Sequence, residues 1–305
     1  KPPPQAPAVS NAIVELLLDA GMPRQGAQIL HGGPEIGSAL VAAPEVAAVS
    51  FTGSAFAGDA VARAAGPKRT VLELGGNAAT IVCGDADLAL AAANCARTGF
   101  SNSGQSCISV QRIYIQEDVF DEFLELLTAE VSKLKVGDPL EDATDVGSMV
   151  DDRAASRVIS WVEEAKSGGA TIPAGGTRQG ATVRPTIVAR PRRDAKVVVE
   201  EVFGALVVAM PFDDFAKVID ECNQSNYGLQ AGLFTNDMRR IFLAWRELQV
   251  GGLVVNGSSN YRLDHVPFGG VKDSGIGRES PRWMIEDYTV IKTLMLRNTS
   301  LWGES

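Results

Sequence analysis

The sequence predicts an α/β fold with parallel sheets, organised in two compact domains. Short, continuously apolar runs alternate with amphipathic segments along most of the chain, and this alternation is typical of βαβ units. The apolar runs show little polar alternation, as expected of strands that helices cover on both faces. A chain of 305 residues, 45% of them hydrophobic, is long enough to build two cores.

The first part of the chain, up to residue 75, is expected to form helices and strands in turn. One helix begins at a Ser/Asn cap and stops at Gly21, and a later one stops at Gly66. The short apolar run "AQILH" lies between two glycines at 27–31. The expected helices are 10–21, 36–43 and 54–66, and the expected strands are 46–51 and 70–74.

The alternation resumes after Gly75 and Gly76, where we place a domain boundary. The second part, 76–273, is expected to contain strands at 78–83, 112–116, 205–212, 229–235 and 251–256. Its expected helices are 85–100, 119–134, 151–167, 213–225 and 237–248. The last part, 274–305, contains "TVIKTLMLRN" (289–298), whose alternation favours an added strand. That strand would pair either with its own domain or with another subunit.

Composition excludes several classes of protein. The net charge of −9 argues against a nucleic-acid partner, which would select a basic surface. No apolar run is long enough to span a bilayer, so no membrane partner is expected. The opening "KPPPQAP" is not a targeting sequence.

The cysteines point to a reducing setting rather than to disulfides or a metal. The four of them form no CxxC pair, and only His31 and His265 are available as partners for a zinc site. We therefore expect no metal, free thiols and a cytoplasmic location. The cysteines are Cys83, Cys95, Cys107 and Cys222.

A glycine-containing turn, "SFTGSAFAG", joins a predicted strand to a predicted helix. Free N–H groups at a helix N-terminus bind phosphates, and Gly53 permits a close approach while Ser54 offers a hydroxyl. The same turn also occurs as an ordinary strand–helix connection, and it is not the GxGxxG fingerprint of the usual dinucleotide fold.

Two further residues have the chemistry of catalytic groups. Glu73 in "LELGG" ends a predicted strand between two leucines, and burial there would raise its pKa toward that of a general base. Cys107 in "SNSGQSC" follows a polar turn, and a thiolate there could attack a carbonyl carbon. The alternatives are a capping or salt-bridged glutamate and a buried structural cysteine.

The order of the motifs is more specific than any one of them. "KPxxQxP", "FTGS", "LELGG", "GQSC", "EEVFG", "NYGLQAGLFTND" and "PFGGVKDSGIGRE" together resemble the aldehyde dehydrogenase superfamily along the whole chain. Within it, the chain is similar to the subgroup that oxidises lactaldehyde, glyceraldehyde 3-phosphate and related small or anionic aldehydes. The resemblance implies an incomplete Rossmann-like dinucleotide-binding domain (1–75), a catalytic domain (76–273), and a return segment with an oligomerisation strand (274–305).

The resemblance also implies roles for the candidate residues. Cys107 would be the nucleophile that forms a thiohemiacetal and then a thioester. Its backbone N–H would donate a hydrogen bond to the oxyanion, and Glu73 would be the base that activates water. The cofactor would be contacted by Lys1, Gly53, Ser54, Gly75, Gly76, Glu201 and Phe203. On the residues alone, Glu201 and Phe203 also fit a charged turn and a core phenylalanine.

Cofactor and substrate preference are expected from three positions. Members that prefer NAD often carry a glutamate where this chain has Pro4, so the site is expected to use NAD and to tolerate NADP. Arg262 and His265 precede "PFGG" on a segment that borders the substrate tunnel in the family, where they would pair with an anionic aldehyde. Arg262 also fits a solvated surface arginine.

The sequence departs from the family pattern in three places. Ala205 stands where a proline usually follows "EEVFG", and Gly257 stands where an aspartate is common. Family members carry a long segment ahead of the "KP" motif that this sequence does not contain. That segment supplies a second oxyanion donor and part of the oligomerisation sheet. The expected function is therefore aldehyde oxidation by a homodimer or homotetramer, with an esterase-like hydrolase or an inactive fragment as alternatives.

Overall fold

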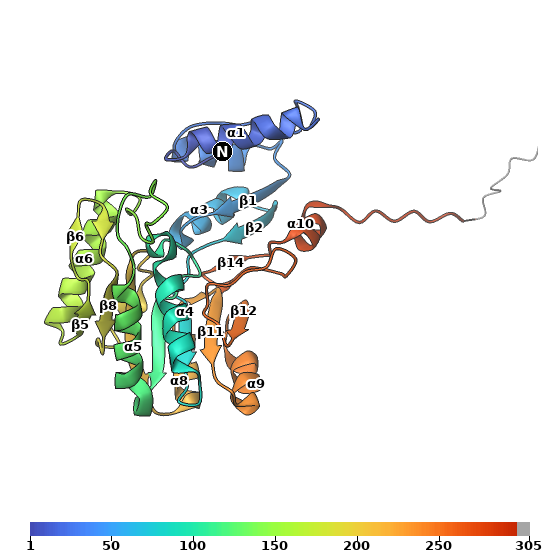
Figure 1. Cartoon of the computed structure of the whole chain (residues 1–305). Coiled ribbons are helices and arrows are strands. Elements are labelled where there is room, and N and C mark those ends of the chain that lie inside the picture. The colour runs from blue at the N-terminus through green and yellow to red at the C-terminus, as the bar shows by residue number, and fades with distance from the viewer. Residues whose placement is uncertain (298–305) are drawn as a thin grey trace, which may run out of the picture.

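A computed structural model describes residues 1–297, and two separate sheets organise this part of the chain (Figure 1). The smaller sheet has the order β1-β2-β14, and the larger has the order β12-β11-β3-β4-β9-β8-β5. Its strands are β3 (Ala79–Val82), β4 (Arg112–Gln116), β5 (Thr171–Ala174), β8 (Thr186–Ala189), β9 (Leu206–Phe212), β11 (Gln230–Phe234) and β12 (Gly252–Val255). All neighbours in the larger sheet are parallel except β5 and β8. The predicted α/β class with parallel sheets is confirmed.

Helices cover both faces of the larger sheet. The connection through α4 (Leu88–Phe100) runs toward one edge, while those through α8 (Phe215–Asn223) and α9 (Met238–Glu247) run toward the other. Right-handed crossovers in opposite directions place their helices on opposite faces. Helix α5 (Phe120–Ser132) packs on α4, and α6 (Asp152–Ser167) contacts β8. One continuous core fills these layers, which explains why the strands are apolar without alternation.

The smaller sheet combines residues from both ends of the chain. Strands β1 (Ala48–Thr52) and β2 (Arg69–Glu73) are parallel, and β14 (Gly275–Ile276) returns to pair antiparallel with β2. Helix α3 (Ala55–Ala65) packs on β1 and β2, and α2 (Pro34–Ala42) packs on α3. Short pairs β6 (Arg178–Gln179) with β7 (Thr182–Val183) and β10 (Tyr227–Gly228) with β13 (Val271–Lys272) complete the strands, and the short helix α7 (Lys196–Val199) follows β8.

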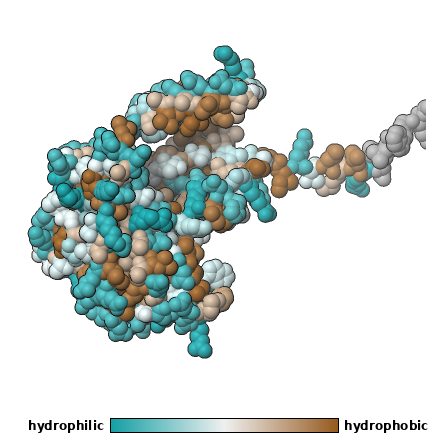
Figure 2. Space-filling view, viewed as in Figure 1, coloured by the Kyte–Doolittle hydropathy of each residue, from teal (hydrophilic) through white to brown (hydrophobic). Residues whose placement is uncertain are grey.

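Helix α1 (Pro7–Asp19) begins earlier than the predicted helix at 10–21. Pro7 occupies its first position, where the fixed φ of proline suits a helix, while the side-chain oxygen of Asn11 accepts from the His31 ring nitrogen at 2.9 Å instead of capping. The helix has no buried residue, and Figure 2 shows apolar side chains along it. Those exposed are Val9, Ile13, Leu16 and Leu17. The apolar run 27–31 forms no strand.

The predicted C-terminal strand is not formed within this chain. After α10 (Pro281–Tyr288), residues 289–297 carry no regular structure and run away from the body in Figure 1. Their side chains are exposed, with Ile291 at 96% and Leu294 at 79%. A strand needs a neighbour to accept its hydrogen bonds, and no strand of the described residues pairs with this segment. The end of the predicted strand, Asn298, lies outside the described residues. Across residues 1–297, no helix is long and apolar enough to cross a membrane.

Candidate active site

The two sheets meet at the predicted catalytic residues. Glu73 is the last residue of β2, and Gly75 and Gly76 lead directly from it toward β3. Cys107 lies just before β4, and Glu201 lies just before β9. The carboxyl end of one sheet therefore faces the amino ends of three strands of the other, which gathers polar loops at one place.

A strained turn presents the candidate nucleophile. Asn102 and Ser103 have φ of 51° and 56°, which non-glycine residues adopt rarely. Gly104 has φ of 71°, and a Cβ there would lie 2.0 Å from the carbonyl oxygen of Gly204, so the position requires glycine. The Ser103 hydroxyl donates to the Gly147 carbonyl at 2.9 Å and fixes the turn from the other side.

The Cys107 thiol is a free, partly buried group in an acidic setting. Burial, together with the negative charges of Glu73 and Glu201, raises its pKa to about 11. The backbone N–H groups of Cys107 and Ile108 act in the opposite direction and favour the thiolate.

Two glycines let the loops around Cys107 come into contact. A Cβ on Gly76 would lie 2.1 Å from the Cys107 carbonyl oxygen, and one on Gly75 would lie 2.6 Å from a carboxylate oxygen of Glu201. The Gly76 N–H donates to Glu201 at 2.8 Å. Burial raises the pKa of Glu201, while this hydrogen bond favours its charged form. The predicted catalytic and cofactor residues Gly75, Gly76, Cys107 and Glu201 are thus brought together.

Glu73 has the surroundings expected of a base. It is 3% exposed, and among residues 1–297 neither of its carboxylate oxygens has a hydrogen-bond partner. Burial and, to a smaller extent, the negative charge of Glu279 raise its pKa to about 8, against the opposing charges of Arg262 and Arg278. A carboxyl group with such a pKa is poised to exchange protons near neutral pH. A Cβ on Gly269 would lie 2.9 Å from it, so "PFGG" packs directly on this carboxylate.

Glu279 is the residue that the sequence interpretation missed. Its carboxylate pairs with Arg262 at 3.0 Å, and the Arg262 guanidinium lies 4.3 Å from the centre of the Phe268 ring. Arg262 is therefore neither a freely solvated arginine nor an unpaired cation. His265 is exposed and has no hydrogen-bond or ion-pair contact among residues 1–297. The signal for Glu279 was its place in "GRE", next to the glycines that contact Glu73.

The other cofactor candidates lie on separate elements. The Ser54 hydroxyl caps α3 by accepting from the Ala57 N–H at 3.3 Å, so the predicted helix N-terminus is present beside Gly53. Phe203 has φ of 44° and is 41% exposed, so it is not a core phenylalanine. In the described part of the chain, no hydrogen bond or ion pair ties Lys1 to Ser54 or Gly53.

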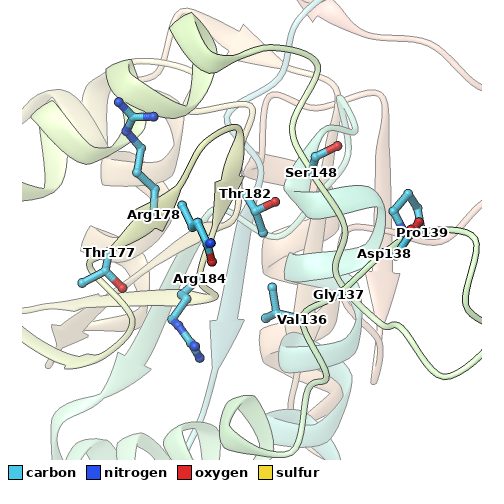
Figure 3. A pocket seen from close by; sticks show the side chains of 10 residues that line it. Val136, Gly137, Asp138, Pro139, Ser148, Thr177, Arg178, Thr182 and Arg184 are labelled. Atoms are coloured by element: carbon cyan, nitrogen blue, oxygen red, sulfur yellow. The ribbon is translucent and has the colours of Figure 1, made fainter.

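One cavity lies away from these groups. A hollow of about 790 Å³ lies between the β6–β7 pair and the loop that follows α5. Figure 3 shows its two arginines, Arg178 and Arg184, pointing in opposite directions, so they do not converge on a ligand. Arg178 instead pairs with Asp152. Within residues 1–297, no group of three or more His, Cys, Asp or Glu is arranged to hold a metal ion.

Comparison with known proteins identifies the family. The model of the "Aldehyde dehydrogenase family" matches residues 1–294. The 3-sulfolactaldehyde dehydrogenase of Priestia aryabhattai is 44% identical over 297 residues, which are 97% of this chain and 62% of that protein. The glyceraldehyde-3-phosphate dehydrogenase GapN of Methanocaldococcus jannaschii, solved with NADP, superposes with a TM-score of 0.91 at 36% identity, covering 95% of this chain and 64% of that one.

A third comparison agrees. The NAD-dependent aldehyde dehydrogenase of Sinorhizobium meliloti has a TM-score of 0.91 at 31% identity and covers 97% of this chain and 60% of that one. Nearly all of this chain aligns with the 3-sulfolactaldehyde dehydrogenase, but it spans only 62% of the length of that protein. With a family match over nearly all of its residues, the chain belongs to the aldehyde dehydrogenase family.

Proposed function

We propose that this chain carries the catalytic residues of an NAD(P)-dependent aldehyde dehydrogenase that converts a small anionic aldehyde to its acid. The observation that carries the proposal is the meeting of a thiol, an unpaired buried carboxylate and a glycine-lined loop around Cys107, Glu73 and Gly76. The family match supports the reaction class. Nothing in the comparisons favours the esterase-like alternative.

In the proposed mechanism, Cys107 and Glu73 carry out the bond and proton changes together with solvent water. The Cys107 thiol gives its proton to solvent and the thiolate adds to the aldehyde carbon, while the Cys107 N–H stabilises the oxygen anion of the thiohemiacetal. An NAD(P) held by Ser54, Glu201 and Phe203 would supply the hydride acceptor for the oxidation of that carbon. Glu73 then takes a proton from water, which attacks the resulting thioester, releases the acid and returns Cys107 to its starting form.

The residues present fit a dinucleotide. Ser54 and the N-terminus of α3 offer N–H and hydroxyl groups to a pyrophosphate. Glu201 offers a carboxylate to a ribose, and its Gly76 contact sets its position. Phe203 presents an exposed ring beside them. We propose that Lys1 contacts the other ribose, as the resemblance implies.

The test of the reaction class is cofactor reduction in the presence of aldehydes. The purified protein is mixed with NAD or NADP and with 3-sulfolactaldehyde, glyceraldehyde 3-phosphate and a neutral aldehyde of similar size. We expect reduced cofactor to form only when aldehyde is present, and fastest with the anionic ones. A protein that hydrolyses p-nitrophenyl acetate but reduces neither cofactor would contradict the proposal.

Pro4 is proposed to permit NADP. It is exposed and occupies a turn in which the Ala6 N–H donates to the Pro3 carbonyl at 3.2 Å. Pro4→Glu introduces a carboxylate that repels a 2′-phosphate, and we expect the Kd for NADP to rise about tenfold, equivalent to about 1.4 kcal/mol, with little change for NAD. Calorimetric titration measures both constants, and Pro4→Gln is the uncharged control. Equal changes for both cofactors would show that Pro4 does not set this preference.

Arg262 is proposed to bind the anionic end of the aldehyde. Two of the compared proteins are named for sulfonated or phosphorylated substrates, which supports an anionic one here. We expect Arg262→Ala to raise KM for an anionic aldehyde about tenfold and to leave that for a neutral aldehyde unchanged. Arg178→Ala removes a paired arginine on the β6–β7 element and serves as the control. If Arg262→Ala raises both KM values equally, its role is the ion pair with Glu279 rather than substrate binding.

We also propose the larger context of the chain. The exposed apolar side chains of residues 290–296 support pairing of this segment with a second copy, and hence a homodimer or homotetramer. The free thiols of the four cysteines support a reducing, cytoplasmic location. The division at residues 75 and 273 follows the change from one sheet to the other and the return through β14.

A further inference from the structure

A buried glutamine connects the segment of Cys107 to the loop that carries Glu201. Gln111 is 5% exposed and lies just before β4. Its side-chain oxygen accepts from the Val202 N–H at 2.9 Å, and its side-chain nitrogen donates to the Glu200 carbonyl at 2.7 Å. The amide thus pairs with the peptide groups on both sides of Glu201.

These bonds act together with the buried Val202 side chain to fix the loop. Phe203 holds a φ of 44°, a conformation that costs free energy for a residue with a side chain. The sequence has Ala205 in place of the usual proline, so the loop lacks that restraint. The Val202 carbonyl is held in addition by the Arg157 guanidinium at 2.7 Å. Gln111 and Arg157 therefore bond to the peptide groups next to Glu201 and Phe203, and these groups set the direction of both side chains.

A second buried glutamine bonds to the loop that contains Ser259 and Tyr261. Gln230 is 8% exposed at the start of β11. Its side-chain nitrogen donates to the Ser259 carbonyl at 2.7 Å and to the Tyr261 carbonyl. This loop continues into Arg262, while the Ser259 hydroxyl donates to the Ile108 carbonyl at 2.9 Å.

We propose that Gln111 is a positioning residue for the cofactor and Gln230 a positioning residue for the aldehyde. Gln111 holds Glu201 against the Gly76 N–H, and so sets the ribose-binding carboxylate beside Cys107. Gln230 holds the loop of Arg262 without touching the cofactor side. The inference rests on the proposed function, because it assigns each loop to one ligand of that reaction.

The test is a pair of matched substitutions with separate readouts. Gln111→Met and Gln230→Met keep the length of the side chain and remove its hydrogen bonds, leaving buried peptide groups unpaired. We expect Gln111→Met to raise the Kd for the cofactor about tenfold, since a lost 1.4 kcal/mol is a factor of ten. Its KM for aldehyde at saturating cofactor should change less than about twofold. We expect Gln230→Met to raise the KM for aldehyde about tenfold and to change the Kd for the cofactor less than about twofold.

Two further measurements keep the result clear. Thermal unfolding shows whether each variant folds. If Gln111→Met does not, Arg157→Met removes the bond to the Val202 carbonyl together with the guanidinium charge that favours the ionised form of Glu201, and it should weaken cofactor binding in the same way. If Gln111→Met and Gln230→Met both raise the cofactor Kd and the aldehyde KM to the same degree, the inference is overturned. A wild-type protein that binds neither NAD nor NADP would overturn the proposed function and the inference together, whereas unchanged cofactor binding in Gln111→Met overturns the inference alone.

Discussion

Cys107→Ala is expected to abolish aldehyde oxidation, lowering kcat/KM on the order of 10⁴-fold or more, as removal of a catalytic nucleophile does. The substitution removes the only thiol that Glu73 and Glu201 face. The side chain is only partly buried, against Ile108, Leu229 and Phe268, so the loss of stability should be small. Steady-state rates with the best aldehyde, together with thermal unfolding, measure the two effects separately.

The matched control is a thiol outside the site. Cys222 is 6% exposed on α8 and belongs to the core that packs on the larger sheet. Cys222→Ala should lower the free energy of unfolding slightly and leave kcat/KM within about twofold. Cofactor reduction by Cys107→Ala at a rate close to that of wild type would exclude Cys107 as the nucleophile.

Glu73→Gln is expected to slow turnover by about 10² to 10⁴-fold, the range for loss of a general base. The amide keeps the size of the side chain, but it cannot take the proton of the attacking water. The first turnover, which forms reduced cofactor, should remain much faster than the later ones. Stopped-flow measurement should therefore show a burst of reduced cofactor that wild type lacks. A variant with equal first and later rates would show that Glu73 does not act on the thioester.

The pH dependence of the same variant gives an independent check. The pKa of Glu73 is about 8 in the folded protein and lies above its usual value of 4.5. The activity of wild type should rise with pH through about 8, as the carboxyl group loses its proton, and this rise should be absent in Glu73→Gln.

The stability of the wild-type protein should fall with rising pH over the range in which its activity rises. The raised pKa means that the folded state holds the proton more tightly than the unfolded state. The resulting stabilisation is complete below pH 4.5 and is lost as the pH rises through 8. The Tm of Glu73→Gln relative to wild type should therefore increase with pH over this window. Parallel Tm curves would show that the carboxyl group is not buried as described.

Much of the fold follows from local sequence signals. The predicted strand 112–116 has the bounds of β4, and Asp87 caps α4 within the predicted helix. These elements are bounded by side chains that act on their own backbone, so the sequence reveals them. The helix at 10–21 was misplaced because its start depends on Pro7 and on a contact between Asn11 and His31. The pairing of β14 with β2 joins segments about 200 residues apart, which no local pattern indicates.

The sequence indicated which residues belong to the candidate site, but it did not indicate how these residues contact one another. Isolated motifs for Glu73 and Cys107 left structural alternatives open, and only the order of motifs favoured catalysis. The contacts that distinguish the alternatives are long-range: Gly76 against Cys107, and Glu201 against Gly76. Gln111 carried no recognisable motif, because its role comes from two backbone groups contributed by a distant loop.

The central claim is that Cys107 forms a thioester that Glu73 helps to hydrolyse. The most direct measurement is intact-mass analysis of Glu73→Gln after brief mixing with aldehyde and cofactor, followed by peptide mapping. We predict one added acyl group per chain, on the peptide that contains Cys107, and none when the oxidised cofactor is omitted. An acyl group on another residue, or an unmodified chain during the burst of cofactor reduction, would contradict the claim.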